Sequence, residues 1–334
     1  MSRLRVGING FGRIGRILFR AGFDRIEIVG INNLGDAKGA AHLLKYDSAH
    51  GVYGYTVKAA ENKIIVNDRS IPLSAEKDPA QIPWGDWGVD VVLECSGAFK
   101  NKEDFEKHIQ AGAKRVLVSA PAKGADLTIV YGINQELYDP TRHKVLSNAS
   151  CTTNCLAPMA KVLHDNFGIE RAYMTTIHSY TNDQMVLDGF HKDMRRARSA
   201  AVSMIPTTTG AAKAVAQVLP ELSGKIDGCA IRVPTPDVSL VDLVFESTRE
   251  LSSNAINSAF KAASEDQFKG VLACEEAPLV SCDFIGNPYS SIVDLPSTMV
   301  MGKNFAKVFS WYDNEMGFSH RMVDMALYMA DRGL

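Results

Sequence analysis

Short apolar runs alternate with segments of helical spacing through the first half of the chain. Residues 4–9 form an apolar run, and the apolar positions that follow are spaced three and four apart, which predicts a strand and then a helix. The alternation continues with predicted strands at 26–31, 89–93 and 115–118 and a predicted helix at 102–113. Strands and helices in this order build a doubly wound, mostly parallel sheet of the α/β class.

The second half of the chain follows a different pattern. Apolar and polar residues alternate through 228–247, which is typical of long strands in an antiparallel sheet. Further predicted elements are strands at 144–147, 171–180, 279–284 and 307–312, a helix that starts near 151, and a final helix after 317. Since 334 residues exceed one typical domain and no long linker or repeat is present, we expect two domains joined tightly near residue 149.

Composition and charge exclude several classes of protein. The hydrophobic content of 46% and the formal net charge of -2 exclude a mainly disordered chain and favour neither nucleic acid nor a membrane surface as partner. No run reaches the about 20 apolar residues of a membrane span, and the first residues carry no signal-peptide core, so we expect a cytoplasmic protein. Six cysteines without a CxxC pair predict neither a disulfide framework nor a metal site.

A glycine-rich turn joins the first predicted strand to its helix. In the sequence GFGRIG, Gly10 permits the tight turn, Gly12 lets the backbone approach a pyrophosphate, and Gly15 lets the helix pack against the strand. This context of strand, turn and helix predicts a Rossmann dinucleotide-binding domain. Ligands of such sheets bind beyond the carboxyl ends of the strands, which places Ser96, Gly97 and Ser119 near the cofactor.

The second strand lacks the acidic residue that ordinarily binds the ribose hydroxyls. The chain has Asn33 where an Asp or Glu is usual about 20 residues beyond the turn. An amide binds a hydroxyl but does not repel a 2′-phosphate, so both NAD and NADP stay open. Asp36 is an alternative ribose ligand, and a helix cap is an alternative role for Asn33.

A cysteine at a predicted helix start is the candidate nucleophile. Cys151 precedes the helical run, and the free N–H groups there are expected to lower the pKa of its thiol and supply thiolate at neutral pH. Cys155 lies one turn further and is expected to be a packed neighbour. His178, in a strand-like segment, is the candidate proton acceptor. The remaining histidines are expected to be solvated: His42, His50, His108, His143, His164, His191 and His320.

Basic residues suggest anion binding in the second half. The polar segment 180–203 contains Arg196 among other cations and leads into a second helix start at 206–213, which offers hydroxyls and backbone amides to a phosphate. A solvated face is the alternative. Arg232 interrupts an apolar strand, and a buried Arg needs an anion.

Together these segments resemble the phosphorylating glyceraldehyde-3-phosphate dehydrogenases. The resemblance covers nearly the whole chain and is carried by INGFGRIGR at 8–16, SNASCTTNC at 147–155, TTIHSYTNDQ at 175–184, RRARSAA at 195–201, PTTTGAAKAV at 206–215, RVPTP at 232–236 and WYDNEMGFS at 311–319. It implies a Rossmann NAD-binding domain at 1–149 completed by a C-terminal helix at 314–334, an α+β catalytic domain at 150–313 with an antiparallel or mixed sheet, and a homotetramer in which 180–203 approaches a neighbouring subunit's cofactor.

The resemblance also implies roles for single residues. Cys151 matches the nucleophile and His178 its activating base. The positions that match substrate and phosphate ligands are Ser150, Thr152, Thr181, Arg196, Thr209, Gly210 and Arg232. The positions that match cofactor ligands are Gly10, Gly12, Arg13, Ile14, Gly15, Asn33, Lys77, Ser119 and Asn314. Asn33 in place of the usual Asp, and Gly189-Phe190 in place of a frequent Leu-Pro, leave NADP use open.

The implied function is the oxidation and phosphorylation of glyceraldehyde 3-phosphate to 1,3-bisphosphoglycerate in glycolysis or gluconeogenesis, with reduction of NAD through a thioester on Cys151. Erythrose-4-phosphate dehydrogenase is the nearest alternative. A non-catalytic nucleotide-binding regulator is a second, and nucleic-acid binding through the cluster 195–198 is a third, although no aromatic platforms interleave its cations.

Overall fold

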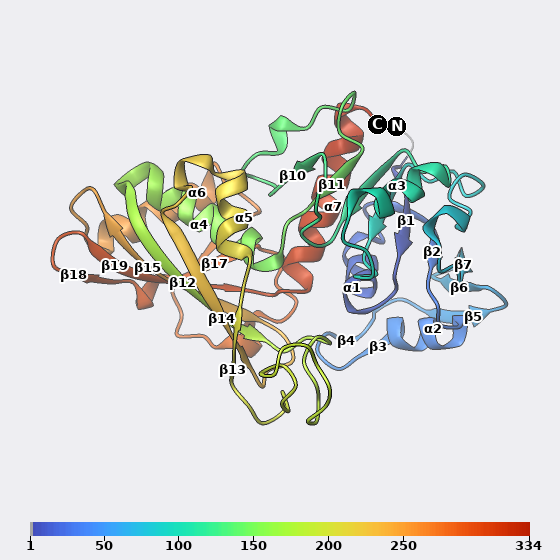
Figure 1. Ribbon diagram of the computed structural model, residues 1–334, viewed down its shortest axis with the longest axis horizontal. Coiled ribbons are helices and arrows are strands. Elements are labelled where there is room, and N and C mark those ends of the chain that lie inside the picture. Colours follow the sequence, from blue (N-terminus) through green and yellow to red (C-terminus); the bar gives the residue numbers. More distant parts are fainter. Residues whose placement is uncertain (1–2) are drawn as a thin grey trace. The chain divides into compact units, whose positions relative to one another are not determined.

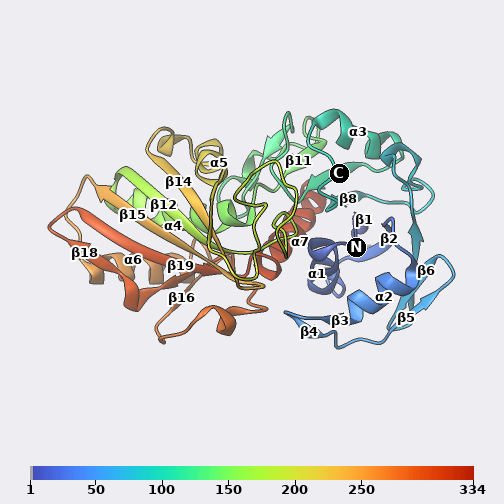
Figure 2. The same ribbon diagram turned by 60° about the horizontal axis from the view of Figure 1, so that its bottom comes forward.

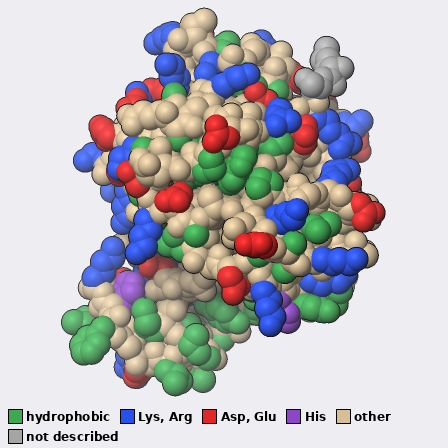
Figure 3. Space-filling model, turned by 90° about the vertical axis from the view of Figure 1, so that its right-hand side faces the viewer, with side chains coloured by type: hydrophobic (Ala, Val, Ile, Leu, Met, Phe, Trp, Pro, Cys, Tyr) green, Lys and Arg blue, Asp and Glu red, His purple; other side chains and the backbone are tan. Residues whose placement is uncertain are grey.

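The computed structural model describes residues 3–334, and the chain divides into two compact units. The first unit comprises the residues up to Ser150 together with Ser319–Leu334, and the second comprises Cys151–Phe318. No helix within residues 3–334 is long and apolar enough to cross a membrane. On the face shown in Figure 3, acidic and basic side chains are interspersed, as the net charge of -2 leads one to expect.

The first unit is built on a nine-stranded sheet with the order β10-β11-β9-β8-β1-β2-β7-β6-β5 (Figure 1). The strands are β1 (Arg5–Asn9), β2 (Glu27–Asn32), β5 (Val57–Ala60), β6 (Lys63–Val66), β7 (Arg69–Ser74), β8 (Val91–Glu94), β9 (Arg115–Val118), β10 (Leu127–Thr128) and β11 (Val145–Ser147). Every pair from β10 to β7 is parallel, which confirms the predicted doubly wound sheet. The antiparallel extension β5–β6–β7 was not predicted, because its strands are only four to six residues long.

Helices lie between these strands in the sequence, and one more comes from the end of the chain. They are α1 (Arg13–Gly22), α2 (Ala37–Lys45), α3 (Lys102–Gln110) and, from Ser319 on, α7 (Met316–Arg332); a short ribbon of β3 (Tyr46–Asp47) and β4 (Gly51–Val52) follows α2. The strands β8 and β9 are buried along their whole length, because helices cover both faces of a parallel sheet. From β1 the chain continues to β2 on one side and later to β8 on the other, so the strand order reverses at the carboxyl end of β1.

The second unit contains an eight-stranded sheet with the order β13-β14-β12-β15-β19-β17-β16 and with β18 beside β19. Its strands are β12 (Ile169–Ser179), β13 (Ile205–Thr208), β14 (Ile226–Val233), β15 (Ser239–Ser247), β16 (Leu272–Glu275), β17 (Ser291–Asp294), β18 (Met299–Met301) and β19 (Phe305–Tyr312). Alternate residues of β15 are buried, since the helices α4 (Cys151–Phe167), α5 (Ala211–Val218) and α6 (Ser253–Glu265) lie against the sheet (Figures 1 and 2).

The structure decides one alternative for the second unit and corrects one expectation. Of the antiparallel or mixed sheet that was expected, the mixed form is present, because β14 pairs parallel to β12 and β16 pairs parallel to β17. Residues 279–284 are not a strand: Ser281–Phe284 form a 3₁₀ turn in which the Asp283 carboxylate accepts from the Val280 N–H at 2.8 Å. The polar residues in this stretch satisfy the backbone locally, which competes with pairing in a sheet.

Candidate active site

Cys151 and His178, both in the second unit, are brought together by a helix and a strand. Ala149 has a φ of 54°, which turns the backbone sharply before α4 begins at Cys151. His178 lies near the end of β12 and is 4% exposed. The Cys151 Sγ atom lies 3.6 Å from His178 Nε2. The arrangement places an imidazole next to a thiol at a helix start.

The electrostatic surroundings of Cys151 differ from the sequence-based expectation. Burial raises the pKa of the thiol above its ordinary value, although the charge of Arg232 and a hydrogen bond from the Thr152 N–H oppose this rise. The helix start therefore acts in the predicted direction, but desolvation outweighs it. The thiol depends on a neighbouring base to lose its proton.

His178 is held neutral by its environment. Burial and, next, the charge of Arg232 lower the pKa of His178 to about 3. The ring nitrogen Nδ1 lies 2.8 Å from the Ser179 carbonyl oxygen and 2.7 Å from Arg232 Nη1. The ring packs at 81° against Tyr312, with centroids 6.0 Å apart. These contacts leave Nε2 as the nitrogen that faces the thiol.

Arg232 reaches His178 because their strands pair in register. The parallel pairing of β12 and β14 sets His178 directly beside Arg232. The Arg232 guanidinium also donates to the Ser179 carbonyl at 3.0 Å, so its two contacts are a ring nitrogen and a carbonyl oxygen, neither of which carries a negative charge. Burial lowers the pKa of Arg232, and within residues 3–334 its Nε is buried without a hydrogen-bond partner. A cation in this condition favours an added anion.

The segment between β12 and β13 carries the other predicted basic ligand. Arg196 donates to the Asp183 carboxylate, and its Nε lies 3.4 Å from Asp193 Oδ2. The charges of Arg196 and Asp183 both act on Arg232, which puts this pair near the Cys151 site. Thr181 N–H donates to Gln184 Oε1 at 2.9 Å. Asp183 is a competing anion for Arg196 that sequence reasoning missed.

The remaining predicted phosphate ligands lie at two helix starts. Thr152 Oγ1 lies 2.9 Å from the Tyr312 hydroxyl, which in turn lies 2.8 Å from Thr176 Oγ1. Ser150 directly precedes Cys151. Thr209 Oγ1 accepts from the Ala211 N–H at 3.2 Å, and Gly210 is the N-cap of α5. Tyr312 was missed because an aromatic residue in an apolar strand predicts only packing.

Asn314 has a fixed amide orientation. Its Oδ1 accepts from the hydroxyls of Ser179 at 2.9 Å and Ser239 at 2.7 Å. Both contacts use the oxygen, so the amide nitrogen is turned away from them and can donate to a carbonyl group. The predicted role of Asn314 towards a carboxamide fits this polarity. Ser239 was not identified from the sequence.

The glycine turn in the first unit has the shape expected for a dinucleotide site. Gly10 has a φ of +88°, and a Cβ there would lie 2.5 Å from Ser96 Cα. A Cβ on Gly15 would lie 2.1 Å from the Gly10 carbonyl oxygen, whereas a Cβ on Gly12 would meet nothing within 4 Å. Among the residues that the structure describes, no side chain caps the start of α1 and no acidic residue lies in its first turn, so this helix start suits a diphosphate.

The other predicted cofactor residues lie around this turn and along the same edge of the sheet. Arg13 Nη1 donates to Asp47 at 2.6 Å. Despite burial, hydrogen bonds from His50, Ala49 and Arg13 lower the pKa of Asp47 to about 2. Ile14 is half-buried in α1, Lys77 is exposed after β7, and Ser119 follows β9.

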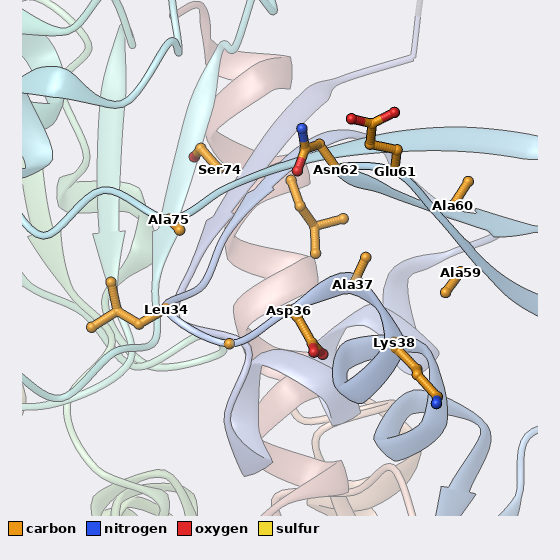
Figure 4. Close-up of a pocket in the computed structure, with 12 residues that line it drawn as sticks. Leu34, Asp36, Ala37, Lys38, Ala59, Ala60, Glu61, Asn62, Ser74 and Ala75 are labelled. Carbon is orange, nitrogen blue, oxygen red and sulfur yellow. The ribbon is translucent and has the colours of Figure 1, made fainter.

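Asn33 does not cap a helix. Its Oδ1 lies 3.4 Å from the Phe11 N–H, whereas Asp36 caps α2 by accepting from the Gly39 N–H at 2.7 Å. The alternative interpretation of Asn33 as a cap is therefore wrong, because the helix begins later than expected. Beside Asn33, the segment from Leu34 to Lys38 borders an open pocket of about 600 Å³ that residues 59–62 and 73–75 also line (Figure 4).

His108 is a further correction. It is 0% exposed rather than solvated, because α3 packs it between Trp84 and Glu94. The charged sequence of this helix does not predict the contact, because the partners of His108 lie in other segments of the chain. Cys155, in contrast, is buried as expected.

Two family models match the chain. Residues 4–102 match the model described as the NAD binding domain of glyceraldehyde 3-phosphate dehydrogenase, and residues 150–314 match the model described as its C-terminal domain. These matches place the chain among the NAD-dependent dehydrogenases, and the predicted cofactor, NAD, is confirmed.

Curated relatives are similar to this chain in sequence over nearly their whole length. The chain is 59% identical over 333 residues to glyceraldehyde-3-phosphate dehydrogenase of Geobacillus stearothermophilus, with 99% of each chain covered. It is 58% identical over 332 residues to glyceraldehyde-3-phosphate dehydrogenase 1 of Bacillus cereus, again with 99% of each covered. It is 54% identical over 333 residues to the Streptomyces coelicolor enzyme of that name, with 98% of this chain and 99% of the relative covered. The chain belongs to the glyceraldehyde-3-phosphate dehydrogenase family. The erythrose-4-phosphate alternative is not favoured.

Proposed function

We propose that this protein oxidises glyceraldehyde 3-phosphate to 1,3-bisphosphoglycerate, with NAD as hydride acceptor and inorganic phosphate as second substrate. The observation that carries the proposal is the contact of 3.6 Å between Cys151 Sγ and His178 Nε2, next to an Arg232 guanidinium whose hydrogen bonds within residues 3–334 go to a ring nitrogen and a carbonyl oxygen. A thiol, a base and a partly buried cation together suit an aldehyde that carries a phosphate.

The first step joins substrate and enzyme. His178 Nε2 takes the proton of the Cys151 thiol, and the sulfur attacks the aldehyde carbon. The proton passes to the aldehyde oxygen, and the product is a hemithioacetal. Arg232 and Thr181 hold the C3 phosphate of the substrate, since the guanidinium is the least compensated cation beside the thiol. The backbone N–H of Cys151 stabilises the developing oxyanion.

The second step oxidises the bound substrate. NAD, when bound, supplies the ring that accepts a hydride. His178 Nε2 takes the hydroxyl proton as the carbon loses its hydride, and a thioester remains on Cys151. Inorganic phosphate then attacks the thioester carbon and releases the acyl phosphate and the Cys151 sulfur. The ligands proposed for the attacking phosphate are Ser150, Thr152, Arg196, Thr209 and Gly210.

Arg232 also sets which nitrogen of His178 is protonated. A guanidinium nitrogen can only donate and the Ser179 carbonyl can only accept, yet both lie within hydrogen-bond distance of Nδ1. While Arg232 occupies Nδ1, the ring proton lies on Nε2 and faces the thiol. A substrate phosphate that draws the guanidinium away lets Nδ1–H donate to Ser179, so that Nε2 becomes the base. Substrate binding thereby activates His178.

The cofactor residues are proposed on the same basis. The first unit binds the dinucleotide, with the diphosphate at Gly10, Gly12 and the start of α1. Arg13, Ile14, Gly15, Lys77 and Ser119 line the remainder, and Asn33 binds the adenosine ribose. The amide N–H of Asn314 is the proposed donor to the carboxamide, as the resemblance implies. The amide at position 33 admits NADP beside NAD.

We also propose a cytoplasmic homotetramer. The segment between β12 and β13 exposes large apolar side chains that an isolated subunit leaves in water, namely Val186, Leu187, Phe190, Met194, Val202 and Met204. Tyr173 and Met301 add apolar surface on the sheet of the second unit. Exposed patches of this kind favour association. Sedimentation equilibrium tests this assembly: a monomer across the micromolar range would contradict it.

The proposed reaction is tested by following NADH absorbance with glyceraldehyde 3-phosphate, with and without inorganic phosphate. We expect turnover that depends on phosphate. Comparable turnover of erythrose 4-phosphate without phosphate would favour the hydrolytic alternative, and the absence of any reduction of NAD or NADP would favour a non-catalytic nucleotide-binding role.

A further inference from the structure

The first unit contains a buried carboxylate that the proposed reaction does not use. Glu94 ends β8 and is 2% exposed. Its Oε1 accepts from the Ser96 N–H at 2.7 Å and from the Ser96 hydroxyl at 2.5 Å. Its Oε2 accepts from Asn9 Nδ2 at 2.5 Å and contacts His108 Nε2 at 2.9 Å. A buried acid with this many partners requires an explanation.

Trp84 determines which ring nitrogen of His108 carries the proton, and His108 in turn donates to Glu94. The indole N–H can only donate, and it donates to His108 Nδ1 at 2.9 Å. The ring proton of His108 is therefore on Nε2, from where it points at Glu94. Both oxygens of the Glu94 carboxylate then act as acceptors, from Ser96, Asn9 and His108.

The acceptor role of Glu94 sets the direction of a series of hydrogen bonds across the sheet. Because the amide nitrogen of Asn9 donates to Glu94, its Oδ1 faces the other way and accepts from Asn32 Nδ2 at 2.8 Å. Asn32 Oδ1 in turn accepts from the Ser74 hydroxyl at 2.8 Å and from the Glu76 N–H at 2.9 Å. Asn9 and Asn32 are 3% and 5% exposed, so water does not offer them alternatives.

These hydrogen bonds run along the carboxyl ends of β8, β1, β2 and β7, where the cofactor is proposed to bind. Asn9 directly precedes Gly10, whose missing Cβ would lie 2.5 Å from Ser96 Cα. Ser96 Oγ, held by Glu94, also accepts from the Ala98 N–H at 3.1 Å. Glu94 thus ties together the two turns that flank the point where the strand order reverses.

We propose that Glu94, oriented by His108, is a positioning residue that holds the dinucleotide turns in their binding shape before the cofactor arrives. The inference rests on the proposed function only in that the ligand is NAD. In Glu94→Gln the new amide nitrogen faces either the Ser96 N–H or the amide nitrogen of Asn9, so a hydrogen bond to one of the two turns is lost. Part of the cost of ordering the turns then falls on binding.

The experiment is calorimetric titration of NAD into the full-length protein, well below the unfolding midpoint of each variant. We expect the Kd of Glu94→Gln for NAD to rise about tenfold. The matched control is Asp126→Asn, which removes a partly buried carboxylate that accepts from the Lys144 and Val145 N–H groups at the opposite, amino end of β11. It should lower the unfolding midpoint and leave the Kd unchanged.

A second pair of variants works even if Glu94→Gln does not fold. His108→Gln offers an amide N–H to Glu94 and a carbonyl to Trp84, so it should keep the Kd within about twofold of the parent. His108→Leu offers neither and should weaken NAD binding about as much as Glu94→Gln. A folded His108→Leu or Glu94→Gln with the parent's Kd overturns the inference. Failure of the parent itself to bind NAD contradicts the proposed function instead.

Discussion

Arg232 Nη1 lies 2.7 Å from His178 Nδ1, on neighbouring parallel strands that pair in register. One cation therefore acts on both proposed catalytic groups, because its charge lowers the pKa of His178 and also that of the Cys151 thiol. It favours the thiolate while weakening the base. An anion that pairs with Arg232 reverses both effects, which couples substrate binding to the protonation of the site.

Replacement of this cation should shift the reactivity of the thiol. In Arg232→Gln the pKa values of Cys151 and His178 both rise, so less thiolate is present at neutral pH. We expect slower alkylation of Cys151 by iodoacetamide at pH 7 and a rate profile displaced to higher pH. Arg196→Gln is the control, since Arg196 is not among the causes that shift the Cys151 pKa. Identical profiles for Arg232→Gln and the parent would contradict the coupling.

The nucleophile can be tested against its buried neighbour. Cys151→Ser should abolish turnover while NAD still binds, because a hydroxyl is far less acidic than a thiol. Cys155 is also on α4, but its Sγ lies 3.8 Å from Ser291 Oγ and 3.8 Å from the Ser310 carbonyl. Cys155→Ser should therefore retain activity. Steady-state NADH formation and NAD titration measure the two effects, and an active Cys151→Ser would remove that sulfur from the reaction.

His178→Asn should slow turnover by about 10²–10⁴-fold, the usual contribution of a positioned base. Retention of the parent rate would exclude His178 from the chemistry. Because asparagine does not titrate near neutral pH, this variant also separates proton transfer from packing.

The same variant should change the response of stability to acid. The folded-state pKa of His178 is about 3 against an ordinary value of 6.5. Above pH 6.5 neither state binds the proton, but below it the unfolded chain does, so the free energy of unfolding falls as the pH drops towards 3. We expect the unfolding midpoint to fall less between pH 7 and pH 5 in His178→Asn than in the parent. Equal losses would show that His178 does not stay neutral.

Cofactor selectivity should depend on position 33. Asn33→Asp places a carboxylate where a 2′-phosphate would lie, so we expect NADP affinity to fall at least about tenfold while NAD affinity is retained. Asn33→Ala, which removes the amide without adding charge, is the control and should not discriminate. Titration with both dinucleotides measures the ratio, and unchanged NADP binding in Asn33→Asp would place the ribose elsewhere.

Much of the fold was predictable from local patterns. The glycine turn, the parallel strands β8 and β9 and the helix that starts at Cys151 follow from periodicity and from residues with few conformational alternatives. The turn at 281–284 and the antiparallel strands β5–β7 were not predictable in this way. The turn satisfies its backbone groups locally, and the strands of four to six residues are too short to show a clear period.

By itself the sequence determined which chemistry is available: a thiol at a helix start, a histidine in a strand and a cation in an apolar run. Only the tertiary structure decided the protonation of these groups. The pairing of β12 with β14 put Arg232 against His178, and burial outweighed the helix start at Cys151. His108 followed the same rule, since Trp84 and Glu94 set its proton from distant segments. Periodicity reports which face of an element is buried, but desolvation and the charges of neighbours depend on contacts that only the folded chain makes.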